Sequence, residues 1–173
     1  MQSAFLQPSL FNTSLNPAPD TLRKDLCVAY FAACKGKKKK QCVREFDQHW
    51  EDNLRQLHHE LLTGTYQIRP STCFIIRDPV QREVFAADFR DRIVHHLLYN
   101  YLAPIYEKQF IYDSYSCRVG KGTHFGIQRM KRFMRASSEN FTKEAWVLKL
   151  DVKGFFMNID KRVLRGMIEN FLQ

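Results

Sequence analysis

Apolar side chains recur every three or four residues in five stretches of the chain, and this spacing predicts amphipathic helices. The apolar positions of these stretches span residues 22–33, 43–61, 89–101, 127–133 and 163–171. Asp20 or Thr21 can cap the first helix, and Gly64 is suited to close the second. Pro104 is expected to end the third helix, and Asp160 stands where the N-cap of the last one should lie.

Extended segments are expected between the second and third helices and again before the last one. The first group consists of residues 66–69, 73–77 and 82–86. Asp78-Pro79-Val80-Gln81 has the residues of a type I turn, which predicts a hairpin with Arg77 and Arg82 at its two shoulders. Apolar residues alternate from Ala145 to Leu150, a pattern typical of a strand. Helices combined with a few strands indicate the α+β class.

The net charge of the chain indicates what kind of partner it binds. The 173 residues include 27 Lys and Arg against 18 Asp and Glu, which gives a net charge of +9. Such an excess favours a polyanionic partner, nucleic acid first and an anionic membrane surface second, although a solvated basic surface gives the same count. Five lysines fall within Lys35–Lys40, and this run is either a solvated loop or a holder of a phosphate backbone.

Composition argues against several classes of protein. Hydrophobic residues make up 45% of the chain and charged residues 26%, which is typical of a globular protein rather than a disordered one. No stretch approaches the roughly 18 apolar residues of a membrane span, and the N-terminus lacks the pattern of a secretory signal. The five cysteines form no Cys-x-x-Cys pair, which favours reduced thiols in the cytoplasm over a disulfide scaffold or a zinc site.

Two acids frame a short aromatic segment after the expected strand Ala145–Leu150. Asp151 follows the strand directly, and Asp160 lies nine residues further on. An Asp after a strand is common in turns, and this is the ordinary interpretation. The alternative is a magnesium ligand, because this hard cation takes one or two carboxylates together with water and substrate phosphates. A helix-capping role already accounts for Asp160.

Three blocks of the sequence resemble those of bacterial reverse transcriptases of the group II intron, retron and diversity-generating retroelement kind. Residues 148–160, LKLDVKGFFMNID, resemble the first catalytic block of that family. Residues 84–110, VFAADFRDRIVHHLLYNYLAPIYEKQF, resemble the block in which an Arg-Asp-Arg helix follows the fingers hairpin. Residues 110–127, FIYDSYSCRVGKGTHFGI, resemble the next block. The blocks stand in family order, and the resemblance covers about Lys35 to Gln173.

The resemblance implies a domain organisation. Residues 1–19, which are rich in Ser, Asn, Pro and Gln, form a flexible N-terminal arm. Residues 20–136 correspond to the fingers with their β-hairpin. Residues 137–173 correspond to the first part of the palm, which carries the first catalytic aspartate in an incomplete sheet.

The resemblance also implies roles around the two acids. Asp151 resembles the first metal-binding aspartate of the palm, with the Val152 carbonyl as an additional ligand. Gly154 and Phe155 lie where backbone amides reach an incoming triphosphate. Phe156 falls at the aromatic position that discriminates between sugars. Ordinary core packing is the alternative for the two phenylalanines.

Basic residues are implied in the binding of nucleotide and nucleic acid. Arg82 resembles the fingers arginine that grips the triphosphate. Arg77 is a candidate for the accompanying basic residue, in a short hairpin that lacks the family's frequent lysine. The resemblance implies contacts to nucleic acid at Arg118 and Lys121, and the basic face of the helix after Thr123 adds Arg129 and Arg132 as candidates. A solvated helix face is the alternative for the last of these.

The function implied is that of the N-terminal portion of an RNA-directed DNA polymerase. Its cofactor would be Mg²⁺, two ions in the complete active site, and its partners an RNA template, a DNA primer, deoxynucleoside triphosphates and an accessory protein. The family's aromatic-x-Asp-Asp block and thumb are not in this sequence. These 173 residues alone are therefore expected to be inactive and to self-associate through an apolar strand edge. The alternative is a non-catalytic basic module that binds RNA or a protein partner.

Overall fold

The computed structural model describes residues 18–78 and 81–172. Most of the predicted N-terminal arm and the tip of the predicted hairpin turn lie outside these ranges. The chain divides into two compact units, residues 1–105 with 165–173 and residues 106–164. The boundary predicted at residues 136 and 137 stays a prediction.

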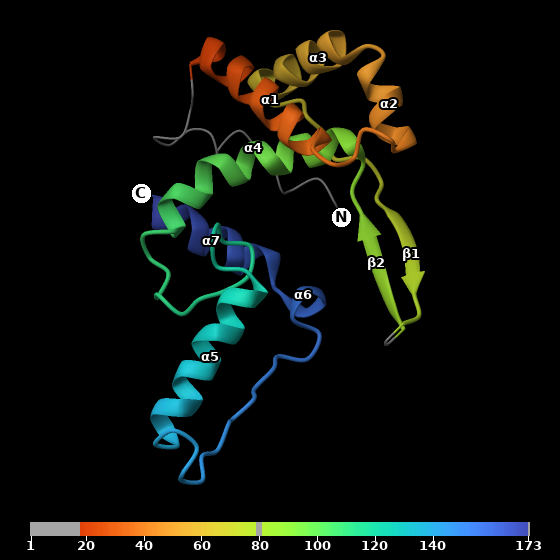
Figure 1. Ribbon diagram of the computed structural model, residues 1–173. Helices are drawn as coiled ribbons and strands as arrows, with labels where there is room; N and C mark the ends of the chain where they lie inside the picture. Colours follow the sequence, from red (N-terminus) through yellow and green to blue (C-terminus); the bar gives the residue numbers. More distant parts are fainter. Residues whose placement is uncertain (1–17, 79–80, 173) are drawn as a thin grey trace. The chain divides into compact units, whose positions relative to one another are not determined.

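Four helices of the first unit enclose one apolar core (Figure 1). They are α1 (Pro19–Cys34), α2 (Gln41–Asp47), α3 (Trp50–Thr63) and α4 (Phe89–Tyr106). The predicted helical periodicity is confirmed, because the buried positions are those of the apolar pattern. The largest fully buried side chains are Leu26, Leu57, Ile93, Leu97, Val94 and Asp91. None of the helices within the described ranges is long and apolar enough to cross a membrane.

The predicted cap of the first helix was wrong by two or three residues. Helix α1 begins at Pro19, and Ala18 is its N-cap. Proline suits the first helical position because that residue's N–H would have no partner within the helix. Asp20 instead lies in the first turn, where its negative charge interacts favourably with the positive end of the helix dipole.

The second predicted helix is divided in two. Helix α2 ends at Asp47 and α3 begins at Trp50, with His49 outside the helical conformation at φ −133°. At the break, the Phe46 carbonyl accepts from the Asn53 side-chain amide at 3.0 Å and from the His49 backbone N–H at 3.4 Å. The apolar spacing continues through the break, and the spacing alone could not reveal it. Gly64 closes α3 in the left-handed conformation at φ 68°, as predicted.

Helix α4 extends past Pro104 to Tyr106, so the predicted end was wrong by two residues. A proline lacks the N–H that bonds the carbonyl four residues before it. Near the end of a helix only one such bond is lost, and the chain keeps its helical path for a further half turn.

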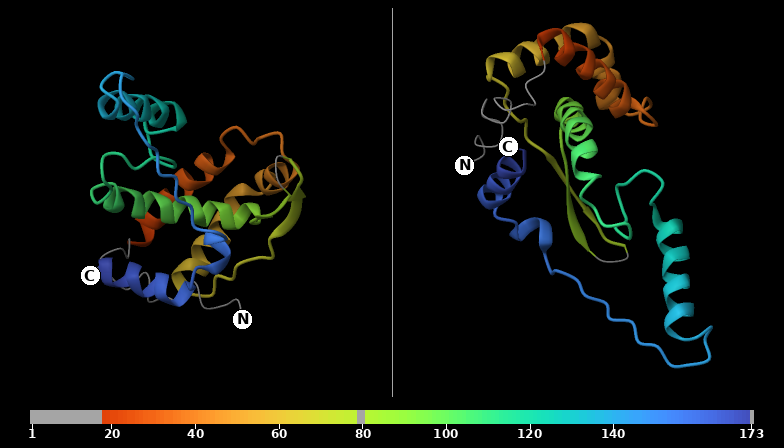
Figure 2. Two further views of the ribbon diagram at one scale, coloured as in Figure 1. Left: turned by 90° about the horizontal axis from the view of Figure 1, so that it is seen from below. Right: turned by 90° about the vertical axis from the view of Figure 1, so that its left-hand side faces the viewer.

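The predicted hairpin is confirmed. Strands β1 (Thr72–Ile76) and β2 (Arg82–Ala86) pair antiparallel, with Thr72 opposite Ala86 and Ile76 opposite Arg82. The two strands twist around each other (Figure 2). Residues 66–69, predicted to be extended, form no strand and connect α3 to the hairpin.

The second unit contains α5 (Thr123–Ser137) and the single turn α6 (Phe155–Asn158). The strand predicted at Ala145–Leu150 is wrong. These residues run between α5 and α6 without strand pairing (Figure 1), and Trp146 is 93% exposed. A strand needs a neighbour for its backbone hydrogen bonds, and the only sheet in the described part of the chain is the hairpin. The fold is therefore α+β, but mostly helical.

Helix α7 (Lys161–Leu172) begins as predicted at an Asp160 cap. Asp160 Oδ1 accepts hydrogen bonds from the backbone N–H of Arg162 at 2.8 Å and of Val163 at 3.3 Å. These bonds satisfy two of the donors that open every helix.

Candidate functional site

Asp151 lies at an open hollow in the second unit. Five consecutive or neighbouring residues line this cavity of about 420 Å³, named here the Asp151 hollow: Leu150, Asp151, Val152, Phe155 and Phe156. Phe156 is 85% exposed and Phe155 52% exposed. The structure thus brings together a carboxylate, a backbone carbonyl and two rings from one short segment. Neither ring lies in a core.

Gly154 forms the bend that shapes the Asp151 hollow. Its φ of +65° is left-handed, a conformation that side chains with a Cβ rarely adopt. A Cβ at this position would lie 2.7 Å from Asn158 Nδ2. The Gly154 carbonyl accepts from the backbone N–H of Met157 and of Asn158, both at 3.1 Å. The bend sets the rings of Phe155 and Phe156 5.4 Å apart at an interplanar angle of 72°.

The donor set of the hollow fits magnesium only in part. The Asp151 carboxylate and the Val152 carbonyl are hard oxygen ligands of the kind that Mg²⁺ takes. Within residues 18–78 and 81–172, no group of three or more His, Cys, Asp or Glu side chains could hold a metal ion. Asp160 is engaged in capping α7. Any ion at Asp151 would draw its other ligands from water, from substrate phosphates or from residues beyond those described.

Arg77 and Arg82 lie at the same end of the hairpin in the first unit. Arg82 opens β2 opposite Ile76, and Arg77 follows directly after β1. Paired residues project from the same face of the hairpin, which places Arg82 on the face of Ile76. A continuation of β1 by one residue would place Arg77 on the opposite face. Both arginines are exposed. Their location at the hairpin end agrees with the shoulders expected from the sequence.

Arg118 is enclosed by its own loop, residues 107–122, named here the Arg118 loop. Its guanidinium pairs with both oxygens of Glu107, with Nη2 at 2.7 Å from Oε2 and Nε at 3.0 Å from each oxygen. Nη1 donates to the carbonyls of Ile111 and Ser114 at 3.0 Å. The side chain is 9% exposed. Most of its hydrogen-bonding capacity therefore serves to close the loop.

A second ion pair joins α5 to the Arg118 loop. Arg129 donates from Nε and Nη2 to the two oxygens of Asp113 at 2.7 and 2.8 Å. Tyr115 donates to the same carboxylate at 2.6 Å. The hydrogen bond from Arg129, followed by that from Tyr115, lowers the pKa of Asp113 to about 2. The Arg129 guanidinium also lies 4.8 Å from the ring centre of Phe133, a cation–π distance.

The two remaining basic residues differ in their surroundings. The Lys121 ammonium donates to the Tyr112 carbonyl and lies 4.0 Å from the centre of the Tyr112 ring. Arg132 is exposed on α5, with no hydrogen bond or ion pair to any residue within the described ranges. The sequence did not indicate the partners of these basic residues, which are Glu107 for Arg118, Asp113 for Arg129 and Tyr112 for Lys121. The one available signal was the acid and tyrosines of the segment Tyr112–Tyr115, which lies inside the third resembling block.

The Arg-Asp-Arg sequence at the start of α4 joins several elements of the first unit. Asp91 is fully buried and accepts from the Tyr66 hydroxyl at 2.5 Å and from the Arg69 backbone N–H at 2.9 Å. The Arg90 guanidinium pairs with Glu60 of α3 and lies 5.0 Å from the centre of the Tyr66 ring. Burial, followed by the bond to Asp91, raises the pKa of Tyr66. These contacts fix the connection that leads into the hairpin.

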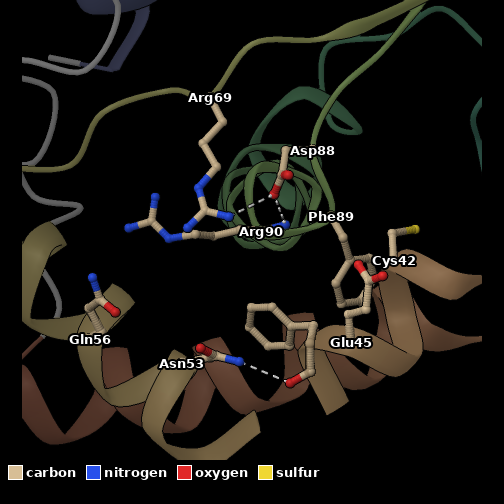
Figure 3. A pocket seen from close by; sticks show the side chains of 9 residues that line it. Cys42, Glu45, Asn53, Gln56, Arg69, Asp88, Phe89 and Arg90 are labelled. Atoms are coloured by element: carbon tan, nitrogen blue, oxygen red, sulfur yellow. Dashed lines mark hydrogen bonds and ion pairs between the residues drawn. The ribbon is translucent and has the colours of Figure 1, made fainter. Parts of the chain in front are cut away.

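A polar cavity of about 210 Å³ lies next to these contacts in the first unit (Figure 3). The Asp88 carboxylate accepts from the Arg90 backbone N–H at 2.9 Å and lies 3.7 Å from Arg69 Nη1. The residues that line the cavity are Cys42, Glu45, Phe46, Asn53, Gln56, Arg69, Asp88, Phe89 and Arg90. The lining contains both acidic and basic side chains, and Arg69 and Asp88 form an ion pair with each other.

No protein-family model matches the chain. It is 30% identical over 113 residues to Protein YkfC of Escherichia coli, covering 64% of this chain and 29% of that protein. It is 26% identical over 121 residues to the group II intron-encoded protein LtrA of Lactococcus lactis, covering 68% of this chain and 19% of LtrA. It is 27% identical over 85 residues to nuclear intron maturase 1, mitochondrial, of Arabidopsis thaliana, covering 49% of this chain and 11% of the maturase.

The chain thus spans between about a tenth and three tenths of the length of these curated relatives. Its similarity to an intron-encoded protein and to an intron maturase supports a distant relationship to that group of proteins. This relationship agrees with the resemblance of the three sequence blocks.

Proposed function

We propose that the chain is the fingers and first part of the palm of an RNA-directed DNA polymerase. The complete protein would add deoxynucleotides to a DNA 3′-hydroxyl on an RNA template by phosphoryl transfer. Support comes from the three ordered blocks and from the similarity to a group II intron-encoded protein. The incomplete coverage of the relatives is in keeping with a first portion of a longer enzyme.

The observation that carries the proposal is the composition of the Asp151 hollow. A carboxylate for a metal ion, a glycine bend and an exposed ring follow one another around a single open cavity. Phosphoryl transfer requires mainly positioning and charge neutralisation. Asp151 would position a metal ion, and the ion would supply the positive charge. A structural role alone would not require Phe156 to stand 85% exposed beside a carboxylate.

Four residues of the Asp151 hollow, together with the neighbouring Gly154, take roles in this proposal. Asp151 and the Val152 carbonyl hold the metal. Gly154 and Phe155 bring backbone amides to the triphosphate, and Gly154 is suited to a close approach because it has no side chain. Phe156 presents its ring to the sugar, where fixed bulk excludes a 2′-hydroxyl by steric contact.

The metal in question is Mg²⁺, two ions in the complete site. When bound, such ions activate the attacking hydroxyl and neutralise the charge on the phosphates. The described residues supply one carboxylate to this set. Further carboxylates from the rest of the enzyme are therefore part of the proposal.

The basic residues would complete the binding of substrate. Arg82, with Arg77, would grip the triphosphate from the hairpin end, since guanidinium groups bind phosphate oxygens in a bidentate manner. Nucleic-acid contacts are proposed at Lys121, Arg132, Arg118 and Arg129. Since Arg118 and Arg129 already bind Glu107 and Asp113, any contact that they make would come from the outer edges of their ion pairs.

A second candidate function is a non-catalytic basic module that binds RNA or a protein partner. The isolation of Asp151 favours it, because the residues within the described ranges gather no metal-ligating group of three. The open apolar residues of the second unit, such as Leu148 and Leu150, would suit a protein partner or self-association.

Primer extension by the complete gene product distinguishes the two functions. The informative pair is Asp151→Asn and Asp160→Asn, because both replace a carboxylate with an amide of the same shape. Asn is also a good N-cap, and Asp160→Asn should therefore keep α7 and the activity. The polymerase proposal requires synthesis that is lost in Asp151→Asn alone. RNA binding without synthesis in the unaltered protein would instead identify the non-catalytic module.

A further inference from the structure

The turn between α1 and α2 concentrates positive charge. Residues Lys35–Lys40, named here the basic turn, contain five lysines, and Arg44 follows in the last turn of α2. Residues 35–44 contain six basic and no acidic side chains. None of these six forms an ion pair with an acid in the part of the chain that the structure describes. The basic turn is the orange connection between α1 and α2 in Figure 1.

The backbone of the basic turn is fixed. Gly36 adopts the left-handed conformation at φ 70°. The N–H groups of Lys37 and Lys40 donate to the carbonyls of Cys34 and Lys37, both at 2.9 Å. The lysine side chains therefore start from defined positions, and only their own rotamers need to be ordered on binding.

Helix α4 adds charge to the same region of the first unit. Arg92 of α4 approaches α2, with Nη2 3.4 Å from Cys42 Sγ. Its Nε is buried without a hydrogen-bond partner among the described residues. Burial, followed by the charges of Lys37 and His95, lowers the pKa of His96 on the same helix. Arg92 thus lies beside α2, the helix that directly follows the basic turn.

The contrast with the second unit is informative. Arg118 and Arg129, implied as nucleic-acid contacts, are neutralised by Glu107 and Asp113. A paired arginine offers little net charge to a phosphate, whereas an unpaired lysine offers all of its charge. Unlike those two arginines, the basic side chains of the basic turn have no acid partner among the described residues.

We propose that the basic turn, with Arg44, is a nucleic-acid-binding surface that holds a phosphate backbone. Lysine ammonium groups act as point charges and carry no pattern for reading bases, so binding here should show little sequence preference. The inference goes beyond the polymerase function, because it requires neither synthesis nor Asp151.

The experiment measures binding of the purified chain to a labelled single-stranded RNA over a series of salt concentrations. The variant carries Lys37→Ala, Lys38→Ala, Lys39→Ala and Lys40→Ala. Each phosphate contact on a single strand contributes about 0.7 to the slope of log affinity against log salt. Loss of four contacts should lower this slope by up to about 3 and weaken binding about tenfold or more at low salt.

The matched control removes four exposed lysines elsewhere: Lys24, Lys131, Lys149 and Lys153. Both variants lose the same net charge, and circular dichroism shows whether each keeps its helices. Arms with DNA of the same sequence and with inorganic polyphosphate identify which phosphate source is preferred. Arms with anionic lipid vesicles test the other class of polyanion.

A slope that falls in the turn variant and much less in the control supports the proposal, for RNA or for DNA. Equal decreases of the slope in both variants would mean that binding depends on net charge and not on a particular surface. This result would overturn the proposal. An unchanged slope in the folded turn variant would also overturn it, as would turn-dependent binding to vesicles without binding to nucleic acid. Primer extension does not enter these outcomes, so failure here is distinct from failure of the polymerase proposal.

Discussion

The Tyr66 hydroxyl donates to the buried carboxylate of Asp91 at 2.5 Å, across 25 residues of sequence. Asp91 is 0% exposed and also accepts from the Arg69 backbone N–H. The second residue of the Arg-Asp-Arg sequence therefore fixes the path from α3 into the hairpin. In the first unit, this motif acts through packing and hydrogen bonds.

Tyr66→Phe should destabilise the first unit by about 2 kcal/mol, because it removes a hydrogen bond to a buried charged group. Asp91→Ala should cost more, since it removes the acceptor of both the Tyr66 hydroxyl and the Arg69 N–H. The free energy of unfolding in urea measures both changes. Asp52→Ala is the control, because the pair of Asp52 with Arg55 is exposed and contributes less than about 1 kcal/mol. Equal losses in Tyr66→Phe and Asp52→Ala would contradict this role.

Arg118→Lys should loosen the Arg118 loop even though the positive charge remains. Lysine cannot reproduce the fork to Glu107 together with the donations to Ile111 and Ser114. We expect chymotrypsin to cleave at the tyrosines of the loop about fivefold faster, since cleavage follows the open population. Arg132→Lys, on the exposed face of α5, is the matched control. Identical cleavage of the two variants would show that the fork does not hold the loop.

The Asp113 carboxylate should titrate at about pH 2. An unfolded aspartate titrates near 3.9, so the folded pKa is depressed. The contribution of Asp113 to stability is therefore present above about pH 4 and lost as the pH falls towards 2. A carbon-detected NMR titration measures this pKa directly. Arg129→Gln should return it towards 3.9, and an Asp113 pKa already near 3.9 in the unaltered chain would refute the ion pair in solution.

Gly154→Ala and Gly166→Ala should have opposite effects. At Gly154 the left-handed φ of +65° costs an alanine about 1–2 kcal/mol. Gly166 lies within α7, and a Cβ added there would meet nothing within 4 Å, so alanine should stabilise the helix by about 1 kcal/mol. Hydrogen exchange at the Asn158 amide, which bonds the Gly154 carbonyl, reports on the first change. Exchange that is unaffected by Gly154→Ala would show that the bend carries no strain.

In the complete enzyme, Phe156→Ala should relax discrimination against ribonucleotides by about tenfold or more, or about 1.4 kcal/mol. The same change at Phe155 should have a smaller effect, because Phe156 is the more exposed ring at the hollow. The measurement is the ratio of kcat/KM for deoxyribonucleotide and ribonucleotide. A larger effect at Phe155 would move the sugar contact by one residue, and no effect at either would remove it.

Local patterns predicted most of the helices, the hairpin and two helix ends. Gly64 and Asp160 act through their own backbone neighbours, so their positions could be inferred from sequence alone. The break at His49 could not, because the apolar spacing continues across it. The strand at Ala145–Leu150 had the right alternation, but strand formation depends on a partner, and the described residues offer none.

The same distinction holds at the candidate site. The residues of the Asp151 hollow are close in sequence, and one short block predicted them together. The pairs of Arg118 with Glu107 and of Arg129 with Asp113 join residues 11 and 16 positions apart. Loop conformation selects such pairs, and residue types alone do not. The roles assigned to individual site residues stay predictions.

Trp146 gives the unpaired segment an optical signal. The chain has two tryptophans: Trp146, 93% exposed, and Trp50, stacked 5.6 Å from Tyr30 in the first unit. In a Trp50→Phe variant, emission would come from the second unit alone, at the long wavelengths of a hydrated indole. Any strand that came to pair with residues 145–150 would dehydrate this ring and shift its emission to shorter wavelength. Pairing of residues 145–150 with a strand of another chain could thus be followed in real time by fluorescence.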